Sequence, residues 1–217
     1  MSGYIVAALC AGTPAKLPGG QTSAIAKVPL QGPVAITHLG LAGDTQVNTK
    51  YHGGPDMAVH LYPLAHRAFW RQKIGDHPAL EEPGAFGSNL AVEGIVESEI
   101  RLGQRFRLGS AVLEVSQPRM PCATIERRFG HSGMVKAILG SGRCGWYFRV
   151  VVEGEASAGD MLEPIAGSGT DISIATIFSA LADPKGASDS DLIAELAVSA
   201  ILGSDWRKRA IKRSECA

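Results

Sequence analysis

The stretch VLEVSQPRMPC, residues 112–122, guides the fold prediction because it joins a short β-type run to an abrupt turn. Val112–Ser116 is the β-type run, and Pro118 and Pro121 fix the backbone of the turn and remove two amide donors. Runs of similar length recur between turn-forming residues: Tyr4–Cys10, Ala24–Val28, Val34–Leu39, Ala58–Tyr62, Val112–Ser116 and Tyr147–Glu153. This spacing predicts a mainly β fold, a sandwich or barrel, over the first three-quarters of the chain.

One helix is predicted inside this β region. It runs from Leu64 to Lys73, with Pro63 suited to a first helical position and Gly75 as the stop signal. The small polar segment Gly167–Thr170 is predicted to be a flexible linker at the end of the β region.

Beyond the linker the apolar residues follow a helical period. Ile174, Ile177 and Leu181 begin one stripe, and a second runs over residues 192–201, with Ser188 and Asp189 as caps and Gly203 as its end. A third helix is predicted from Ser204. We therefore expect a β domain over residues 1–166 and a small three-helix domain over residues 171–217.

Composition and charge narrow the class of function. The 217 residues are 45% hydrophobic and 19% charged, which excludes overall disorder. Because 21 acidic and 21 basic residues balance, a general nucleic-acid binder is disfavoured. The charges are nevertheless segregated: residues 76–100 contain six acids and no Lys or Arg, whereas residues 101–150 contain nine bases and two acids. A positive field of this kind concentrates small anions.

The cysteines and the start of the chain indicate a cytoplasmic location. The run Tyr4–Ala11 is far shorter than the about 20 residues of a membrane-spanning helix, and no Lys or Arg precedes it. No C-x-x-C pair is present, so we expect free thiols in a reducing compartment. The four cysteines are Cys10, Cys122, Cys144 and Cys216.

Cys122 is the leading candidate for chemistry. It follows a predicted strand and a rigid turn, and Arg119, Arg127 and Arg128 are near it in the sequence. Nearby cations favour the thiolate, which is both the nucleophile and the metal-binding form of cysteine. The alternative is a small buried side chain without a chemical role.

A second candidate segment surrounds a glycine-rich turn. Residues 52–56 read His-Gly-Gly-Pro-Asp, a tight turn where the backbone can approach a ligand closely. For His52 a pocket role and a structural role both stay open, while packing and hydrogen bonding are expected for His60 and His66. Zinc is the rival interpretation, but the spacings match no compact zinc pattern.

Two further side chains are candidate binding groups. Arg143 precedes a glycine and an aromatic strand, where a guanidinium could bind phosphate or carboxylate in a bidentate manner. Asn89 offers a donor and an acceptor in a loop that enters a strand, which suits the edge of a heterocycle. Trp146, Tyr147 and Phe148 are expected in the core. No Walker loop, G-x-G-x-x-G or G-x-S-x-G motif is present.

Together these segments resemble a MOSC domain, the module named for the C-terminal part of molybdenum-cofactor sulfurases, and within it the YiiM-like subgroup with a C-terminal three-helix domain. The following segments carry the resemblance: Ser23–Lys27, Gly40–Asp44, His52–Asp56, Tyr62-Pro63 with His66 and Trp70, Ala85–Gly87, Ser116–Cys122 and Gly145-Trp146. They span about residues 20–165. One departure is Ser88, which stands where the subgroup usually has an acidic residue.

The resemblance implies a MOSC-type β-barrel that binds molybdenum cofactor, a molybdopterin. It implies Cys122 as the thiolate ligand to molybdenum and the catalytic cysteine, and His52 as a proton donor. Arg119 and Arg143 are then the anchors for the cofactor, and the pocket is lined by His52, Asp56 and Asn89. The implied reaction is the reduction of N-hydroxylated bases or related N-oxygenated compounds, R–NHOH to R–NH2.

The same resemblance shapes the expected partners. Electrons must come from a separate reductase, and the substrate is a small N-hydroxylated compound. Neither a nucleic-acid polymer nor a membrane is expected, pyridoxal phosphate is not expected on this chain, and a homodimer stays open. Two alternatives also stay open: a sulfur-carrier or cofactor-handling protein with a persulfide on Cys122, and a non-catalytic module that binds small anions.

Overall fold

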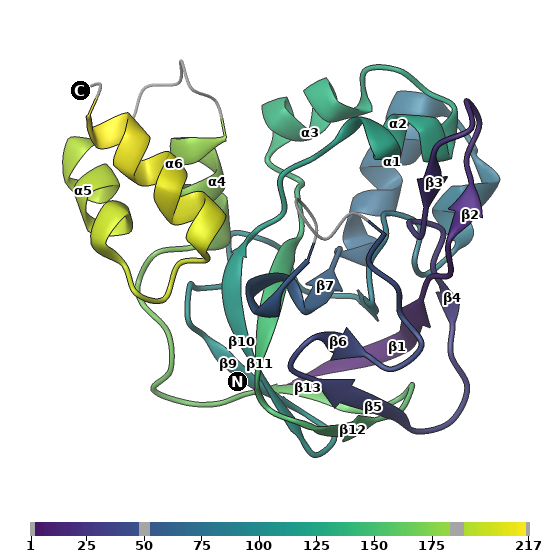
Figure 1. Ribbon diagram of the computed structural model, residues 1–217, viewed down its shortest axis with the longest axis horizontal. Coiled ribbons are helices and arrows are strands. Elements are labelled where there is room, and N and C mark those ends of the chain that lie inside the picture. The colour runs from purple at the N-terminus through teal and green to yellow at the C-terminus, as the bar shows by residue number, and fades with distance from the viewer. Residues whose placement is uncertain (1–2, 48–52, 183–188, 216–217) are drawn as a thin grey trace.

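A closed β-barrel forms the centre of the computed structural model, which describes residues 3–47, 53–182 and 189–215. Within these residues seven strands close into a ring through pairing of the first and last strands, Tyr4 opposite Leu162 (Figure 1). Around the ring they are β13 (Met161–Pro164), β9 (Arg105–Leu108), β10 (Ala111–Pro118), β11 (Trp146–Val152), β7 (Val59–Leu61), β8 (Leu90–Val92) and β1 (Tyr4–Ala11). The predicted mainly β, barrel-type fold is confirmed.

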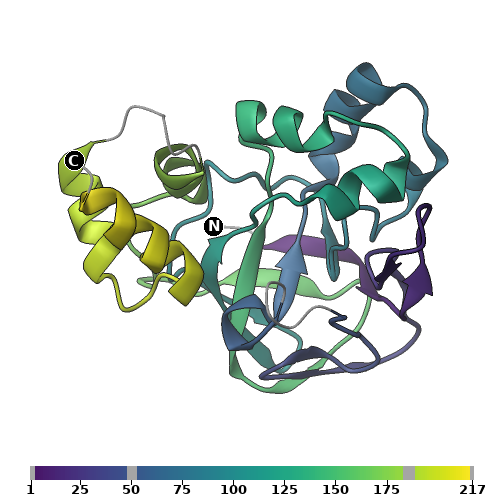
Figure 2. The same cartoon turned by 45° about the horizontal axis from the view of Figure 1, so that its top comes forward.

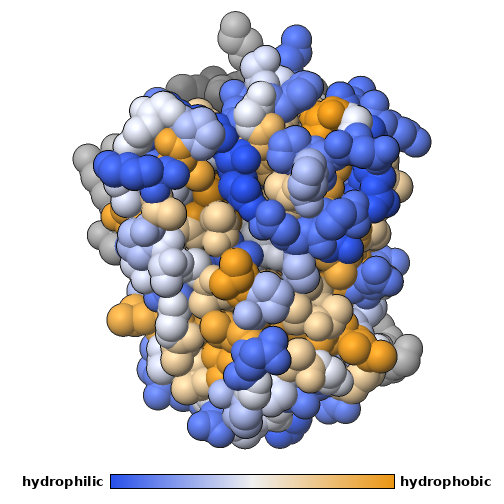
Figure 3. All heavy atoms as spheres, turned by 90° about the vertical axis from the view of Figure 1, so that its right-hand side faces the viewer, coloured by the Kyte–Doolittle hydropathy of each residue, from blue (hydrophilic) through white to orange (hydrophobic). Residues whose placement is uncertain are grey.

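Shorter strands lie on the outside of this ring. They are β4 (Val28–Pro29), which pairs with β1, the sheet of β12 (Gly154–Ala156), β5 (Val34–Thr37) and β6 (Gly40–Leu41), and the hairpin of β2 (Ala15–Lys16) and β3 (Thr22–Ser23). The face that bears β2, β3 and β4 carries a polar band above a more apolar lower half (Figure 3).

One predicted strand was wrong. Ala24–Val28 forms a strand only at Val28, and residues 24–27 have an irregular backbone with a single bridge, from Lys27 to Gly84. The apolar side chains of Ala24 and Ile25 are buried because they line a pocket, so their burial does not require a sheet.

Helices cover one end of the barrel (Figure 2). The predicted helix 64–73 is present as the 3-10 turn η2 (Leu64–His66) followed by α1 (Arg67–Ile74), and it ends at Gly75 with φ +75°. The expectation of a single helix in this region was wrong, because α2 (Ala123–Phe129) and α3 (Met134–Ser141) also form there. Two further 3-10 turns are η1 (Pro55–Met57) and η3 (Pro78–Glu81).

The C-terminal helices pack together beside the barrel (Figures 1 and 2). They are α4 (Ile174–Leu181), α5 (Ser190–Val198) and α6 (Ser204–Ser214). Asp189 caps α5 through the amides of Asp191 and Leu192, whereas Ser188 lies outside the described residues. Gly203 is not the end of α5 but the residue before α6.

The predicted linker, Gly167–Thr170, is hydrogen-bonded to the β domain. The Arg105 amide donates to the Ser168 hydroxyl at 2.9 Å, and the Thr170 amide donates to the Leu102 carbonyl at 2.8 Å. The described helices include none that is both long and apolar enough to cross a bilayer.

Candidate functional site

A pocket of about 140 Å³ lies where the barrel meets α2 and the β2–β3 hairpin. Its wall comes from parts of the chain that are far apart in sequence. The lining residues are Gln21, Thr22 and Ser23 of the hairpin, Ala24, Ile25 and Lys27 after it, the segment 45–47, Met57 of η1, His60 of β7, Phe86, Gly87 and Asn89, then Arg119, Cys122 and Thr124, and Tyr147 of β11.

Cys122 lies in the wall of this pocket, half-buried, between the end of β10 and the start of α2. Its backbone is extended, with φ −136° and ψ 162°, and its carbonyl accepts the amide of Ile125 as the helix begins. The barrel holds the start of the preceding segment, since Pro118 pairs with Trp146 across β10 and β11. Residues 119–122 have an irregular backbone in place of the predicted turn, and this segment leads from the end of β10 to Cys122 in the pocket wall.

The other described cysteines have a different environment. Cys10 and Cys144 are fully buried and do not line the pocket. Burial raises the pKa of the Cys10 thiol to about 11, an effect that Lys27 partly offsets. Burial, with the negative charge of Glu97, raises the pKa of Cys144 well above its usual value. Both thiols therefore stay protonated at neutral pH.

Arg119 is a buried cation at the same pocket. Arg119 is 5% exposed, and its backbone amide donates to the Gly145 carbonyl at 3.0 Å. Its Nη1 atom is buried and has no hydrogen-bond partner among the described residues. Because an unpaired buried donor on a charged group is costly, this atom is suited to an anionic ligand in the pocket.

Lys27 and Asp44 form a buried ion pair beside Arg119, and sequence reasoning gave neither a role. Asp44 also accepts the Gly12 amide at 2.8 Å and the Asn89 side-chain amide at 2.9 Å. Burial lowers the pKa of Lys27, and Asp44 raises it in part. The signal available in the sequence was a lysine just before a strand and a Gly-Asp turn 17 residues later.

Glycines make room for the stem of this lysine. A Cβ on Gly84 would lie 2.8 Å from the Cβ of Lys27 and 2.5 Å from its carbonyl oxygen, and one on Gly12 would lie 3.2 Å from its Cγ. The aliphatic part of the Lys27 side chain therefore packs against the backbone of Gly12 and Gly84, and its amine lies at the pocket wall.

Asn89 also lines the pocket, but its amide is already engaged by the protein. Its Nδ2 donates to the Cys10 carbonyl at 3.1 Å and to Asp44, and its Oδ1 accepts the His60 amide at 3.0 Å. Asn89 thus holds β1, β7 and Asp44 together. Its neighbour Ser88 donates to the Pro83 carbonyl at 3.2 Å and does not line this pocket.

Three predicted site residues lie elsewhere or are not described. The guanidinium of Arg143 lies 4.3 Å from the centroid of the Phe69 ring, and Arg143 does not line the pocket. Asp56 bonds to Arg149 and to the Ser204 amide, also outside the pocket wall. His52 falls in residues 48–52, outside the described part of the chain.

His60 and His66 are buried and bond to neighbouring groups of the protein, and His60 also lines the pocket. The Nδ1 of His60 lies 3.0 Å from the Gly87 carbonyl, and its ring centroid is 4.9 Å from that of Tyr147. His66 is buried and bonds to Glu97 at 2.9 Å. Residues 3–47, 53–182 and 189–215 contain no group of three or more His, Cys, Asp or Glu side chains that could hold a metal ion.

Known proteins match both the sequence and the fold. The MOSC domain family matches residues 48–163. Protein YiiM of Escherichia coli is 39% identical over 149 residues, which is 69% of this chain and 66% of that protein. A protein named Reductase from Gibberella moniliformis is 37% identical over 146 residues, 66% of this chain but 26% of that protein.

A solved structure agrees with this assignment. The crystal structure of YiiM from Geobacillus stearothermophilus superimposes with a TM-score of 0.80 at 28% identity, covering 97% of this chain and 99% of that one. The barrel, the pocket with its cysteine and these matches lead to one conclusion: the chain belongs to the MOSC domain family and is a YiiM-like member of it.

Proposed function

We propose that this protein is a molybdenum-cofactor-binding oxidoreductase that reduces N-hydroxylated bases or related N-oxygenated compounds. Membership of the MOSC family and the similarity to a protein named Reductase support an oxidoreductase-like or cofactor-binding role. The observation that carries the finer proposal is the pairing, in one pocket, of the half-buried thiol of Cys122 with the buried, unpartnered Nη1 of Arg119.

The donor set of the pocket fits molybdenum cofactor. A thiolate is a soft ligand that suits a thiophilic metal, and a guanidinium with an unpartnered Nη1 suits a phosphate. Cys122 would ligate the metal and Arg119 would hold the phosphate. Arg143, whose guanidinium lies over Phe69 away from the pocket, is not needed as an anchor.

When bound, molybdenum cofactor would supply the two-electron oxygen-transfer chemistry of the reaction. The overall reaction is R–NHOH plus two electrons and two protons giving R–NH2 and water. Electrons would come from a separate reductase, and a cytoplasmic location remains part of the proposal.

The chain's own residues bind the substrate and hold a proton. Lys27 carries a proton on Nζ in the pocket wall, with Asp44 as its counter-ion. Phe86 and Met57 offer apolar surface to a planar ring, while Asn89 fixes Asp44 in place. Lys27 is therefore a candidate proton donor in addition to His52, which lies outside the described residues.

The test measures molybdenum and turnover in the same preparations. Protein made in a cofactor-competent host is analysed for molybdenum and assayed for reduction of 6-hydroxylaminopurine with a chemical electron donor. Cys122→Ala is expected to lose both metal and turnover. Cys10→Ala, which removes a buried thiol outside the pocket, is the matched control and should retain both.

Two outcomes contradict the proposal. A molybdenum-loaded wild-type protein without turnover of any N-hydroxylated base would exclude the reductase activity. A persulfide mass on Cys122 in molybdenum-free protein would favour the sulfur-carrier alternative instead.

A further inference from the structure

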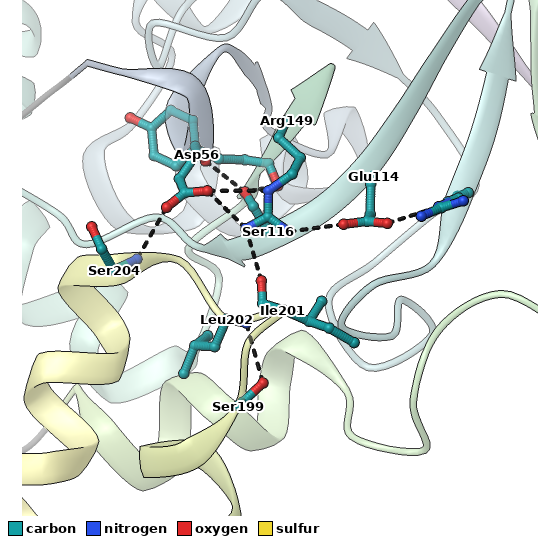
Figure 4. Close-up of polar contacts among 10 residues, drawn as sticks. Asp56, Glu114, Ser116, Arg149, Ser199, Ile201, Leu202 and Ser204 are labelled. Atoms are coloured by element: carbon teal, nitrogen blue, oxygen red, sulfur yellow. Dashed lines mark hydrogen bonds and ion pairs between the residues drawn. The ribbon is translucent and has the colours of Figure 1, made fainter. Parts of the chain in front are cut away.

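The N-terminus of α6 lies directly against the barrel (Figure 4). The Gly203 amide donates to the carbonyl of Ser116 on β10 at 3.0 Å. A Cβ on Gly203 would lie 1.9 Å from Oε1 of Gln117, so a larger residue at this position would require the Gln117 side chain to move. The helix thus starts in contact with the strand that leads to Arg119.

The cap of α6 comes from a distant part of the chain. Gly203, the residue before the helix, has no side chain to offer, and the carboxylate of Asp56 accepts the Ser204 amide at 3.1 Å. A carboxylate at this position satisfies a free amide and interacts favourably with the helix dipole. Asp56 belongs to η1 of the barrel, 148 residues earlier.

Arg149 completes the contact (Figure 4). Its Nη2 donates to Asp56 at 2.7 Å and to the Ile201 carbonyl at 2.8 Å, while its Nη1 donates to Glu114 at 2.8 Å. Burial lowers the pKa of Arg149, but the hydrogen bonds to Asp56 and Glu114 raise it by more. The charged guanidinium therefore joins β11 to the helical segment.

The segments that hold α6 are the same segments that form part of the pocket wall. Met57 follows Asp56 directly, Arg119 lies three residues after Ser116, and Tyr147 lies two residues before Arg149. The Ser116 hydroxyl joins them internally, because it lies 2.6 Å from the Asp56 carbonyl and 3.0 Å from the Tyr147 carbonyl.

We propose that Asp56 is a positioning residue that couples docking of the C-terminal helices to ligand binding in the pocket. By fixing the start of α6 against η1 and β10, it holds Met57, Arg119 and Tyr147 in the arrangement that binds an anion. Coupling of this kind is reciprocal, so an anion in the pocket must also tighten the docking of α6. The inference rests on the proposed function only in requiring that the pocket binds an anion.

The experiment titrates inorganic phosphate into the full chain. In wild type, saturating phosphate is expected to slow hydrogen exchange at the amides of Gly203 and Ser204. Asp56→Ala is expected to weaken phosphate binding by about 5- to 150-fold, the usual range of coupling between sites, and to abolish the slowing at α6. Asp56→Asn keeps a neutral acceptor for the Ser204 amide and should recover part of the affinity.

The matched control is Asp205→Ala. Asp205 is an acid in the first turn of the same helix, half-exposed and paired with Lys208, so its removal should leave phosphate affinity unchanged. A merely structural role for Asp56 would lower stability without changing phosphate affinity in the folded protein.

The experiment distinguishes failure of the proposed anion pocket from failure of the coupling. If wild type binds no phosphate, the anion pocket of the proposed function is wrong, and the coupling falls with it. If wild type and the folded Asp56 variants bind phosphate equally, or if phosphate leaves exchange at α6 unchanged in wild type, the coupling alone is wrong. The hydrogen-exchange measurement on wild type needs no variant, so it tests the coupling even if Asp56→Ala fails to fold.

Discussion

The amine of Lys27, a residue in the wall of the pocket that contains Cys122, forms a buried ion pair with the carboxylate of Asp44. The two side chains are only 10% and 5% exposed. Two fixed donors, the Gly12 amide and the Asn89 side chain, hold the carboxylate, so the amine has a defined position.

Lys27→Met should be strongly destabilising. It leaves the buried charge of Asp44 unpaired, and breaking a buried pair by removing one partner costs about 3–5 kcal/mol. Adding Asp44→Asn should recover much of this loss, because no uncompensated charge then remains. Urea unfolding of the two single variants and the double variant measures the coupling, and strictly additive losses would contradict it.

Stability in alkaline solution should fall between about pH 9 and pH 11 because of Cys10. Its thiol has a pKa of about 11 when folded and 9.0 as the ordinary value. Over that interval the folded state binds more protons than the unfolded state, so the contribution is fully present below pH 9 and is lost as pH rises. Two pKa units correspond to about 2–3 kcal/mol.

The comparison protein for this effect is Cys10→Ala. Lys27, whose pKa is lowered, contributes a slope of the opposite sign in both proteins, so the difference between the two stability curves measures the Cys10 thiol together with its charge interaction with Lys27. Parallel curves between pH 8 and pH 11 would show that Cys10 does not titrate in this way.

Alkylation should separate the cysteines by environment. Cys122 is half-buried in the pocket wall and should react with iodoacetamide in the native protein, whereas the buried Cys10 and Cys144 should react only after unfolding. Peptide mass spectrometry before and after addition of urea records the order. Native labelling of Cys144 as fast as that of Cys122 would be inconsistent with this structure.

Local patterns predicted the parts of the fold that depend on neighbouring residues. The run before Pro118 correctly indicated a strand that ends ahead of Cys122, and the apolar period after residue 171 correctly indicated helices. By contrast, α2 and α3 have only 7 and 8 residues and lie beside several glycines, so no clear period could appear. The division into domains 1–166 and 171–217 stays a prediction.

Pairings between distant residues could not be predicted from the chain. Lys27 meets Asp44 only because β1, β8 and the loop at Gly84 converge, and Asp56 meets Arg149 across 93 residues. The family resemblance implied a pocket role for Asp56 and Arg143, whereas in the tertiary structure the first caps a helix and the second lies over an aromatic ring.

Asn89→Ala should lower stability before it affects any ligand. The side chain makes three buried hydrogen bonds, to the Cys10 carbonyl, to Asp44 and from the His60 amide. Asp44 keeps its bonds to Lys27 and Gly12, so two groups lose their partner. At about 1–3 kcal/mol for each unsatisfied buried group, we expect a loss of about 2–6 kcal/mol in urea unfolding. A variant of wild-type stability with weaker phosphate binding would instead make Asn89 a direct ligand.

Arg119→Gln and Arg143→Gln should behave differently toward phosphate. Arg119 has a buried, unpartnered Nη1 at the pocket, so phosphate at ten times its dissociation constant should stabilise wild type by about 1.4 kcal/mol, and Arg119→Gln should lose this effect. In a chain of this size that stabilisation corresponds to about 3–6 °C in Tm. Arg143→Gln should keep the full shift because its guanidinium lies over Phe69 and not in the pocket. Thermal unfolding in phosphate against chloride of equal ionic strength measures both variants. If the Arg143 variant loses the shift and the Arg119 variant keeps it, the anion site lies elsewhere on the molecule.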